Sequence, residues 1–225
     1  MSKSNPEPIT GHVPLAVDIL PETAKDRAAV ETFIRDHYAR AYGAEVRHFL
    51  PHLMTLRRSD NRLIAALGYR DASTSDSLYL EHYLDLPVEV QLSLRSGQYC
   101  TRKSMVEVGN LVTAEAGGAR WLATALTAYL KNAGYDWAVF TAVRQLRNAF
   151  ARLGIELIPL AAADATRLPE MERMAWGRYY ETQPIVVAAS VHQSHDALLH
   201  QMQRTADRYH LRPLWDEASL AGMAA

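Results

Sequence analysis

Two stretches, Val106-Glu107-Val108-Gly109-Asn110-Leu111-Val112 and Asn148-Ala149-Phe150-Ala151-Arg152-Leu153-Gly154-Ile155, carry most of the information about the architecture. The first predicts a buried strand that contains a carboxylate and an amide. The second predicts a short helix that ends at a glycine and leads into another apolar run. Between them lie the turn Ala116-Gly117-Gly118-Ala119-Arg120, a long helical pattern and an apolar strand at 137–143. This order predicts a right-handed crossover unit at the centre of a sheet.

The rest of the chain adds strands and helices on either side of this unit. Residues 77–84 are apolar and aromatic, which fits a strand or an extended loop, and 163–184 are irregular. The prediction is an α/β (α+β) fold with a mixed sheet of six or seven strands and helices on both faces. One domain covers 15–191, between a flexible tail (1–14) and a C-terminal helix and tail (192–225). Hydrophobic periodicity predicts strands at 15–20, 53–57, 63–69, 105–112, 137–143, 155–160 and 185–191, and helices at 24–42, 87–94, 117–132, 146–153 and 195–209.

Composition narrows the class of protein. The 225 residues are 48% hydrophobic and 22% charged with a net charge of −1, so the chain can bury a large core but has no global basic field for nucleic acid. The single cysteine, Cys100, excludes an internal disulfide framework and fits a reducing compartment. No apolar stretch is long enough to span a bilayer, and 1–8 lack the apolar core of a signal peptide. We expect a cytoplasmic monomer or homodimer without stable membrane insertion.

The glycine turn stands where a strand meets a helix. Glycines let backbone N–H groups approach a diphosphate, the helix N-terminus favours an anion, and Arg120 could add a counter-charge. A bare Gly117-Gly118 pair is more often only a tight turn, so the motif gains weight only from its context.

That context is a resemblance to a known superfamily. Gly117-Gly118-Ala119 resembles the end of the pyrophosphate loop of the GCN5-related N-acetyltransferases (GNAT), and Phe150-Ala151-Arg152-Leu153-Gly154-Ile155 resembles the signature on the helix that follows. Over about 25–190 the chain is also similar to the bacterial thermostable hemolysin family, which is related to acyltransferases and to acyl-homoserine-lactone synthases. The motifs that carry this similarity are Phe49-Leu50-Pro51-His52-Leu53, Ala65-Ala66-Leu67-Gly68-Tyr69-Arg70, Leu80-Glu81-His82-Tyr83-Leu84-Asp85, Val106-Glu107-Val108-Gly109-Asn110-Leu111, Phe140-Thr141, Leu146-Arg147-Asn148-Ala149-Phe150 and Trp176-Gly177-Arg178-Tyr179-Tyr180.

The resemblance implies a single GNAT-like domain that moves an acyl group from a thioester to the amine of a small molecule such as an amino acid, by direct attack. The donor would be acyl-CoA or an acyl carrier protein. Two departures bear on the donor. Ala114 replaces the Gln or Arg that begins the loop, which weakens the case for the diphosphate of CoA. Phe150 replaces a tyrosine acid, but a thiolate of pKa about 8.5 can leave without one.

Glu107 is the predicted catalytic carboxylate. Held away from water in an apolar strand, it would accept a proton from the attacking ammonium or anchor that ammonium. The alternative is a core carboxylate paired with Arg70. Asn110 is expected beside the thioester carbonyl, where it would orient the amide or cap a turn, and the backbone N–H groups of Leu111 and Val112 would hold the thioester oxygen.

The acceptor side is expected after the predicted hairpin. Arg70 could bind a carboxylate, Glu81 an amine, and Tyr83 could pack on the substrate, although an Arg–Glu pair that braces the sheet is an equal alternative. The resemblance adds Thr141 to the substrate-binding residues. It adds Gly117, Gly118, Ala119, Arg120, Asn148 and Phe150 to those that bind the cofactor; for Asn148 a helix-capping role is the alternative.

Other patterns point to weaker hypotheses. His192, His195 and His200 lack the partners of a known metal site, so no metal is expected. Trp176, Tyr179 and Tyr180 are expected in the core or in the wall of a substrate tunnel. Two further classes of function remain open: a membrane-active, haemolytic lipid-binding protein, and a GNAT relative that binds an acyl ligand without catalysis.

Overall fold

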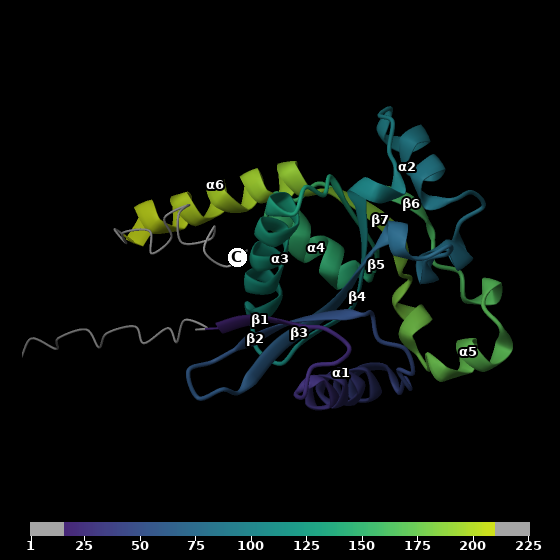
Figure 1. Ribbon diagram of the computed structural model, residues 1–225, viewed down its shortest axis with the longest axis horizontal. Coiled ribbons are helices and arrows are strands. Elements are labelled where there is room, and N and C mark those ends of the chain that lie inside the picture. The colour runs from purple at the N-terminus through teal and green to yellow at the C-terminus, as the bar shows by residue number, and fades with distance from the viewer. Residues whose placement is uncertain (1–15, 210–225) are drawn as a thin grey trace, which may run out of the picture.

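The computed structural model describes residues 16–209, which form one seven-stranded sheet in the order β1-β2-β3-β4-β5-β7-β6 (Figure 1). Only β4 and β5 are parallel, and every other neighbouring pair is antiparallel. The predicted mixed sheet with helices on both faces is therefore confirmed. The strands are β1 Ala16–Leu20, β2 His52–Arg57, β3 Leu63–Asp71, β4 Met105–Thr113, β5 Trp137–Ala142, β6 Ile158–Ala162 and β7 Ile185–Ser190.

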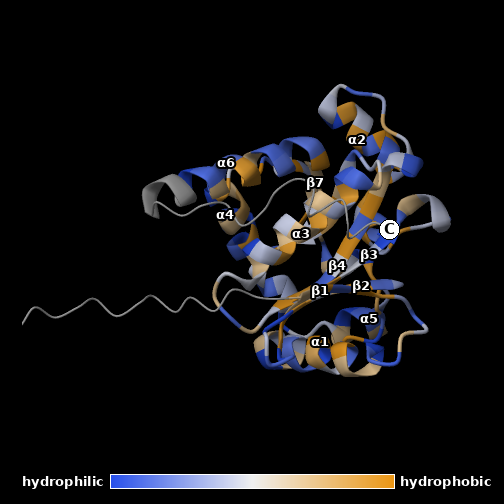
Figure 2. Cartoon of the chain, turned by 60° about the vertical axis from the view of Figure 1, so that its left-hand side comes forward, coloured by the Kyte–Doolittle hydropathy of each residue, from blue (hydrophilic) through white to orange (hydrophobic). Residues whose placement is uncertain are grey.

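Helices cover the two faces of the sheet unequally. On one face lie α3 (Gly118–Asn132), α4 (Arg144–Arg152) and α6 (Val191–Tyr209), whose apolar sides pack on the central strands. The other face carries α1 (Arg27–Tyr42) and α2 (Val88–Ser96), and the short helix α5 (Glu170–Ala175), which has no buried residue, lies near α1 (Figure 1). Apolar residues concentrate in the strands and on the inner sides of the helices, and the outer sides of the helices are polar (Figure 2).

The sheet opens between its two central strands. The β4–β5 ladder runs from Met105↔Trp137 to Val108↔Phe140 and ends there, whereas β4 continues along β3 to Thr113. The β3–β4 register shifts between Ala66 and Gly68, and on the β4 side Asn110 has a positive φ of 53°. This bulge bends β4 away from β5. The backbone of 109–113 therefore borders a gap that no strand fills.

Most predicted elements are present, with shifted ends. The helix expected from residue 24 begins at Arg27, the strand expected at 155–160 is Ile158–Ala162, and the last helix begins at Val191 instead of 195. Residues 77–84 are neither strand nor extended loop, because Tyr79–Tyr83 form a 3₁₀ turn. The irregular segment 163–184 contains α5. The predicted tail at 1–14 lies outside the described residues.

Candidate active site

Two cavities of different chemistry meet at the opening of the sheet. The apolar cavity, of about 400 Å³, lies between the sheet and helices α3, α4 and α6, and reaches through the opening to the C-terminal end of α1. The polar cavity, of about 960 Å³, lies on the opposite face, between α1, the Tyr79–Tyr83 turn and α5. Both volumes are within the range of small-molecule sites. Six residues line both cavities: Tyr38, Val108, Gly109, Asn110, Thr141 and Tyr179.

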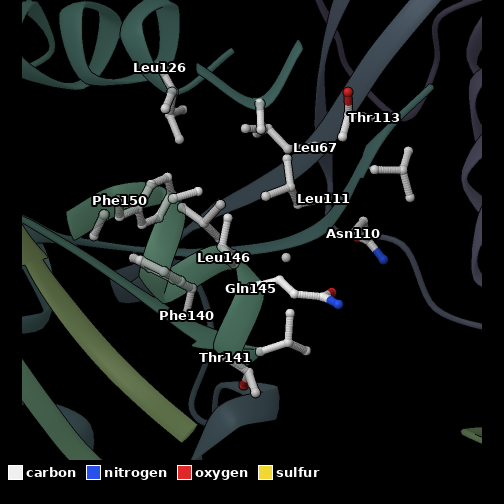
Figure 3. A pocket seen from close by; sticks show the side chains of 18 of the residues that line it. Leu67, Asn110, Leu111, Thr113, Leu126, Phe140, Thr141, Gln145, Leu146 and Phe150 are labelled. Atoms are coloured by element: carbon white, nitrogen blue, oxygen red, sulfur yellow. The ribbon is translucent and has the colours of Figure 1, made fainter. Parts of the chain in front are cut away.

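The apolar cavity is enclosed by aliphatic and aromatic side chains. Phe140 at the end of β5 and Phe150 on α4 meet edge to face, with ring centroids 5.7 Å apart. In Figure 3 the apolar groups surround the space on one side, and the polar ends of Thr113, Asn110 and Gln145 lie on the other. Of the residues predicted at the cofactor or thioester, Asn110, Leu111, Val112, Ala119 and Phe150 line this cavity.

The polar cavity contains an ion pair between two neighbouring strands. Arg70 and Glu107 are register partners on β3 and β4. Glu107 Oε2 accepts hydrogen bonds from Arg70 Nη2 (2.5 Å) and Nε (3.2 Å), and Oε1 accepts one from the Leu80 backbone N–H (3.0 Å). The Glu107 side chain is 5% exposed and that of Arg70 is 22% exposed. The contact raised above as an alternative is thus present, and both groups line the cavity.

Asn110 holds the loop before β2 in place. Its Oδ1 accepts a hydrogen bond from the Leu50 N–H (3.0 Å), and its Nδ2 donates to the His48 carbonyl (3.2 Å). In Figure 3 the amide nitrogen points away from the centre of the apolar cavity. Asparagine tolerates the left-handed backbone that the bulge requires. Its side chain therefore shapes the junction of the cavities from behind the strand.

The glycine turn is tightly packed and carries an acidic residue. Gly117 has a φ of 85° and precedes α3, and a Cβ on Gly118 would overlap Thr113 Oγ1. Glu115, within the turn, pairs with Arg58 and with Arg62 Nη2 (3.2 Å). Of the residues predicted here only Ala119 lines the cavity; Gly117, Gly118 and Arg120 do not. Because both arginines neutralise the Glu115 carboxylate, this carboxylate does not by itself exclude a diphosphate at the turn.

Tyrosines form one wall of the polar cavity. The Tyr83 hydroxyl lies 2.6 Å from that of Tyr180. Trp176 Nε1 donates to the Tyr79 hydroxyl (2.8 Å), which donates to Glu172 (3.1 Å). Burial raises the pKa of Tyr83 and of Tyr79 well above the ordinary value, so both stay protonated at neutral pH. Of the residues expected in the core or in a tunnel wall, Trp176 and Tyr179 line the polar cavity and Tyr180 lines neither cavity; Tyr83, expected near the substrate, also lines the polar cavity.

Glu81 lies apart from the other predicted residues. Its carboxylate accepts hydrogen bonds from Arg102 (2.7 Å) and from the backbone N–H groups of Leu78 (2.7 Å) and Val88 (2.9 Å). It lines neither cavity. Glu81 pairs with Arg102 and not with Arg70, which pairs with Glu107 across β3 and β4, so we omit Glu81 from the proposed site.

On α4, a polar residue other than the predicted one lines the apolar cavity. Asn148 is exposed and lines neither cavity, because α4 turns it to solvent. Gln145, three residues earlier, lines the apolar cavity, and its amide points to the side of the cavity where Asn110 lies (Figure 3). Sequence reasoning missed Gln145 and also Tyr38, which stands on the apolar side of α1 and lines both cavities.

The cysteine and the histidines considered as functional residues in the sequence lie outside the two cavities. Cys100 is buried in the core beside α2 and lines neither cavity. His195 Nδ1 is 3.1 Å from Lys131 Nζ, and His192 pairs with Asp136. Within 16–209 no three His, Cys, Asp or Glu side chains are grouped closely enough to hold a metal ion. None of the helices in that range is both long and apolar enough to cross a bilayer.

Comparison with known proteins gives the fold and the family. The structure is similar to FeeM, an N-acyl amino acid synthase from uncultured soil microbes (TM-score 0.54, 16% identity, covering 84% of this chain and 99% of FeeM). It is also similar to BjaI, a CoA-dependent acyl-homoserine lactone synthase solved with SAM and isopentyl-CoA (0.53, 14%, 88% and 90%), and to the AHL synthase LasI (0.53, 11%, 81% and 93%).

These identities are low enough that the likenesses concern the fold alone. No protein of curated function matches the sequence. The family model described as "Thermostable hemolysin" matches residues 20–195, which is most of the described chain. The chain therefore belongs to the thermostable hemolysin family.

Proposed function

We propose that the protein transfers an acyl group from an acyl thioester to the amine of a small molecule such as an amino acid. The observation that carries this proposal is the junction of the two cavities at the opening between β4 and β5. An apolar chain fits on one face of the sheet and a charged acceptor on the other. The reacting carbonyl would lie at the junction, beside Gly109 and Thr141.

The donor fits the apolar cavity. Its acyl chain would pack against Phe140, Leu146 and Phe150, and the amides of its pantetheine arm would run along the unpaired part of β4 toward Gln145. Backbone N–H groups at Leu111 and Val112 would hold the thioester oxygen as negative charge develops on it. Acyl-CoA and acyl carrier protein share this arm.

The acceptor fits the polar cavity. The Arg70 guanidinium, partly exposed, would bind a carboxylate of the acceptor, and Glu107 would hold its ammonium and take the proton directly or through water. The free amine then attacks the thioester carbon, the new C–N bond forms, and the C–S bond breaks with release of the thiolate, which takes up the proton that the new amide nitrogen loses. No acyl-enzyme is needed.

The relatives support the reaction class. FeeM is an N-acyl amino acid synthase, and BjaI and LasI make acyl-homoserine lactones, so amine acylation occurs on this fold. At 11–16% identity, they leave the acyl chain and the acceptor of this protein open.

The test is an assay of the purified protein with acyl-CoA or acyl carrier protein and a mixture of amino acids and amines. We expect free thiol and an equal amount of amide product, measured by colour reaction and mass spectrometry. Thiol release without amide would indicate hydrolysis and contradict the proposal. Lysis of lipid vesicles by the protein alone, with no acyl transfer, would favour the membrane-active alternative.

A further inference from the structure

The far end of the apolar cavity holds a polar side chain that packing does not explain. Ser194, on the first turn of α6, is 3% exposed and lines the cavity. Within residues 16–209 its hydroxyl has no hydrogen-bond partner, and its oxygen is not fully enclosed by protein atoms, so it faces the cavity. A ligand that fills the cavity without pairing with this hydroxyl would remove it from water with no replacement partner, so a ligand with a hydrogen-bonding group at that point is favoured.

Other hydroxyls in helices on the same face of the sheet are paired within their own helix. Thr124 and Thr127 of α3 each donate to the carbonyl four residues earlier, Arg120 and Ala123, at 2.9 and 2.8 Å. This back-bonding satisfies a hydroxyl inside a helix. Ser194 does not do so with the carbonyl of Ser190, and its hydroxyl remains available to the cavity.

Ser194 is remote from the junction where the acyl carbonyl is placed. It lines the cavity together with Ala138 and Ala189, which are register partners on β5 and β7. Ala138 precedes the junction residue Thr141 by three positions on β5, a distance of about 10 Å along a strand. A chain that starts at Thr141 and fills the cavity would thus bring its distal carbons to Ser194.

Resting on the acyl transfer proposed above, we propose that Ser194 is a specificity-determining residue that selects acyl chains with a hydrogen-bonding oxygen near their far end. The class of ligand is a chain with a hydroxyl or keto group on its distal carbons. The hydroxyl of Ser194 can donate to either group and accept from a hydroxyl. A plain methyl-ended chain would leave it unpaired and bind less tightly.

Binding of free acids tests this without an acceptor. Straight-chain fatty acids of increasing length are compared with partners that carry a hydroxyl on the last carbon, by calorimetric titration. The wild-type protein should prefer the hydroxylated acid at one chain length by roughly three- to tenfold. Ser194→Ala should abolish or invert that preference, and Ser194→Cys, with similar volume and a weaker hydrogen bond, should reduce it. Thr124→Val, on the same side of the sheet but outside the cavity, should keep it.

The outcomes separate the two proposals. If neither acid of any pair binds, the acyl cavity and the inference are both wrong. If both bind but wild type and Ser194→Ala show the same ratio, the inference alone is wrong. Thermal unfolding gives an independent reading: Ser194→Ala should be about as stable as wild type, because it removes no hydrogen bond within the protein. A loss of stability would indicate a structural hydrogen bond and overturn the assignment.

Discussion

Glu107 and Arg70 show which properties of single residues can be predicted from the sequence and which cannot. A carboxylate inside an apolar strand was conspicuous in the sequence, and so was an arginine at the end of a preceding strand. Their pairing depends on the β3–β4 register, which the bulge at Asn110 shifts. Local periodicity contains no information on such a shift, since it arises from contacts between distant segments. The roles of both residues in catalysis stay predictions.

Arg70→Lys tests the acceptor site. Lysine keeps the positive charge but loses the forked geometry that binds Glu107 and an acceptor carboxylate together. We expect the KM for an amino acid acceptor to rise roughly tenfold or more, with a smaller change for an amine without a carboxylate. Steady-state kinetics with both acceptors measure this, and Arg173→Ala, an exposed change on α5, is the control. Equal effects on both acceptors would contradict a carboxylate contact.

Glu81 is predicted to stabilise the fold in a pH-dependent way. Burial alone would raise its pKa, but hydrogen bonds from Arg102, Leu78 and Val88 together lower it below the ordinary value of 4.5. The folded protein thus binds this proton more weakly than the unfolded chain, so the stabilisation is present above about pH 4.5 and is lost as the pH falls.

Glu81→Gln should therefore lower the free energy of unfolding by about 1–2 kcal/mol at pH 7, an amount that allows for partial exposure. The difference from wild type should shrink toward pH 3. Urea unfolding at both pH values measures it, with the exposed Glu156→Gln as the control. A difference that is constant with pH would show that the carboxylate charge is not the cause.

At the scale of elements, the sequence predicts the helix α4 but places its first residue too late. The sequence pattern predicted a helix from 146, whereas α4 begins at Arg144. The predicted helix has Phe150 on its buried side, but it leaves out Gln145, which lines the apolar cavity, and includes Asn148, which lines neither cavity. The Tyr79–Tyr83 turn was missed because it is held by long-range contacts, including Leu80 N–H to Glu107.

The turn before α3 requires glycine at its second position. A Cβ at Gly118 would overlap Thr113 Oγ1 and approach Ala65 Cβ to 3.4 Å. Gly118→Ala should destabilise the protein by about 1–3 kcal/mol, because α3 must shift from β4. The double variant Gly118→Ala/Thr113→Ala removes the overlapping atom and should recover part of the loss. Denaturant unfolding measures both, and equal or greater loss in the double variant would argue against the overlap as the cause.

For the whole molecule, the sheet order brings together segments that are far apart in the chain. Composition and alternating elements predicted a mixed sheet with two covered faces, which the structure confirms. The point at which β4 and β5 separate was not predictable, because it depends on where one ladder ends while its neighbour continues. That separation joins the cavities on the two faces and makes the proposed ternary complex possible.

Because the two cavities have largely different linings, a change in the apolar cavity should affect the donor alone. Ala149 on α4 lines the apolar cavity and is absent from the lining of the polar one. Ala149→Leu adds bulk to the donor side, so long acyl donors should bind less well and the preferred chain should shorten. The KM for the acceptor should change little. Donor titrations over a range of chain lengths measure this, and an unchanged length preference would place the acyl chain elsewhere.

Glu107 has the central role in the proposed mechanism, and the rate of amide formation tests that role directly. The rate of amide formation by Glu107→Gln is compared with that of wild type at the same saturating donor and acceptor. Glu81→Gln serves as the matched control, since it also breaks a Glu–Arg pair but lies outside both cavities. We predict a loss of roughly a hundredfold or more for Glu107→Gln and nearly wild-type transfer for folded Glu81→Gln. Full activity of a correctly folded Glu107→Gln would contradict the proposed mechanism.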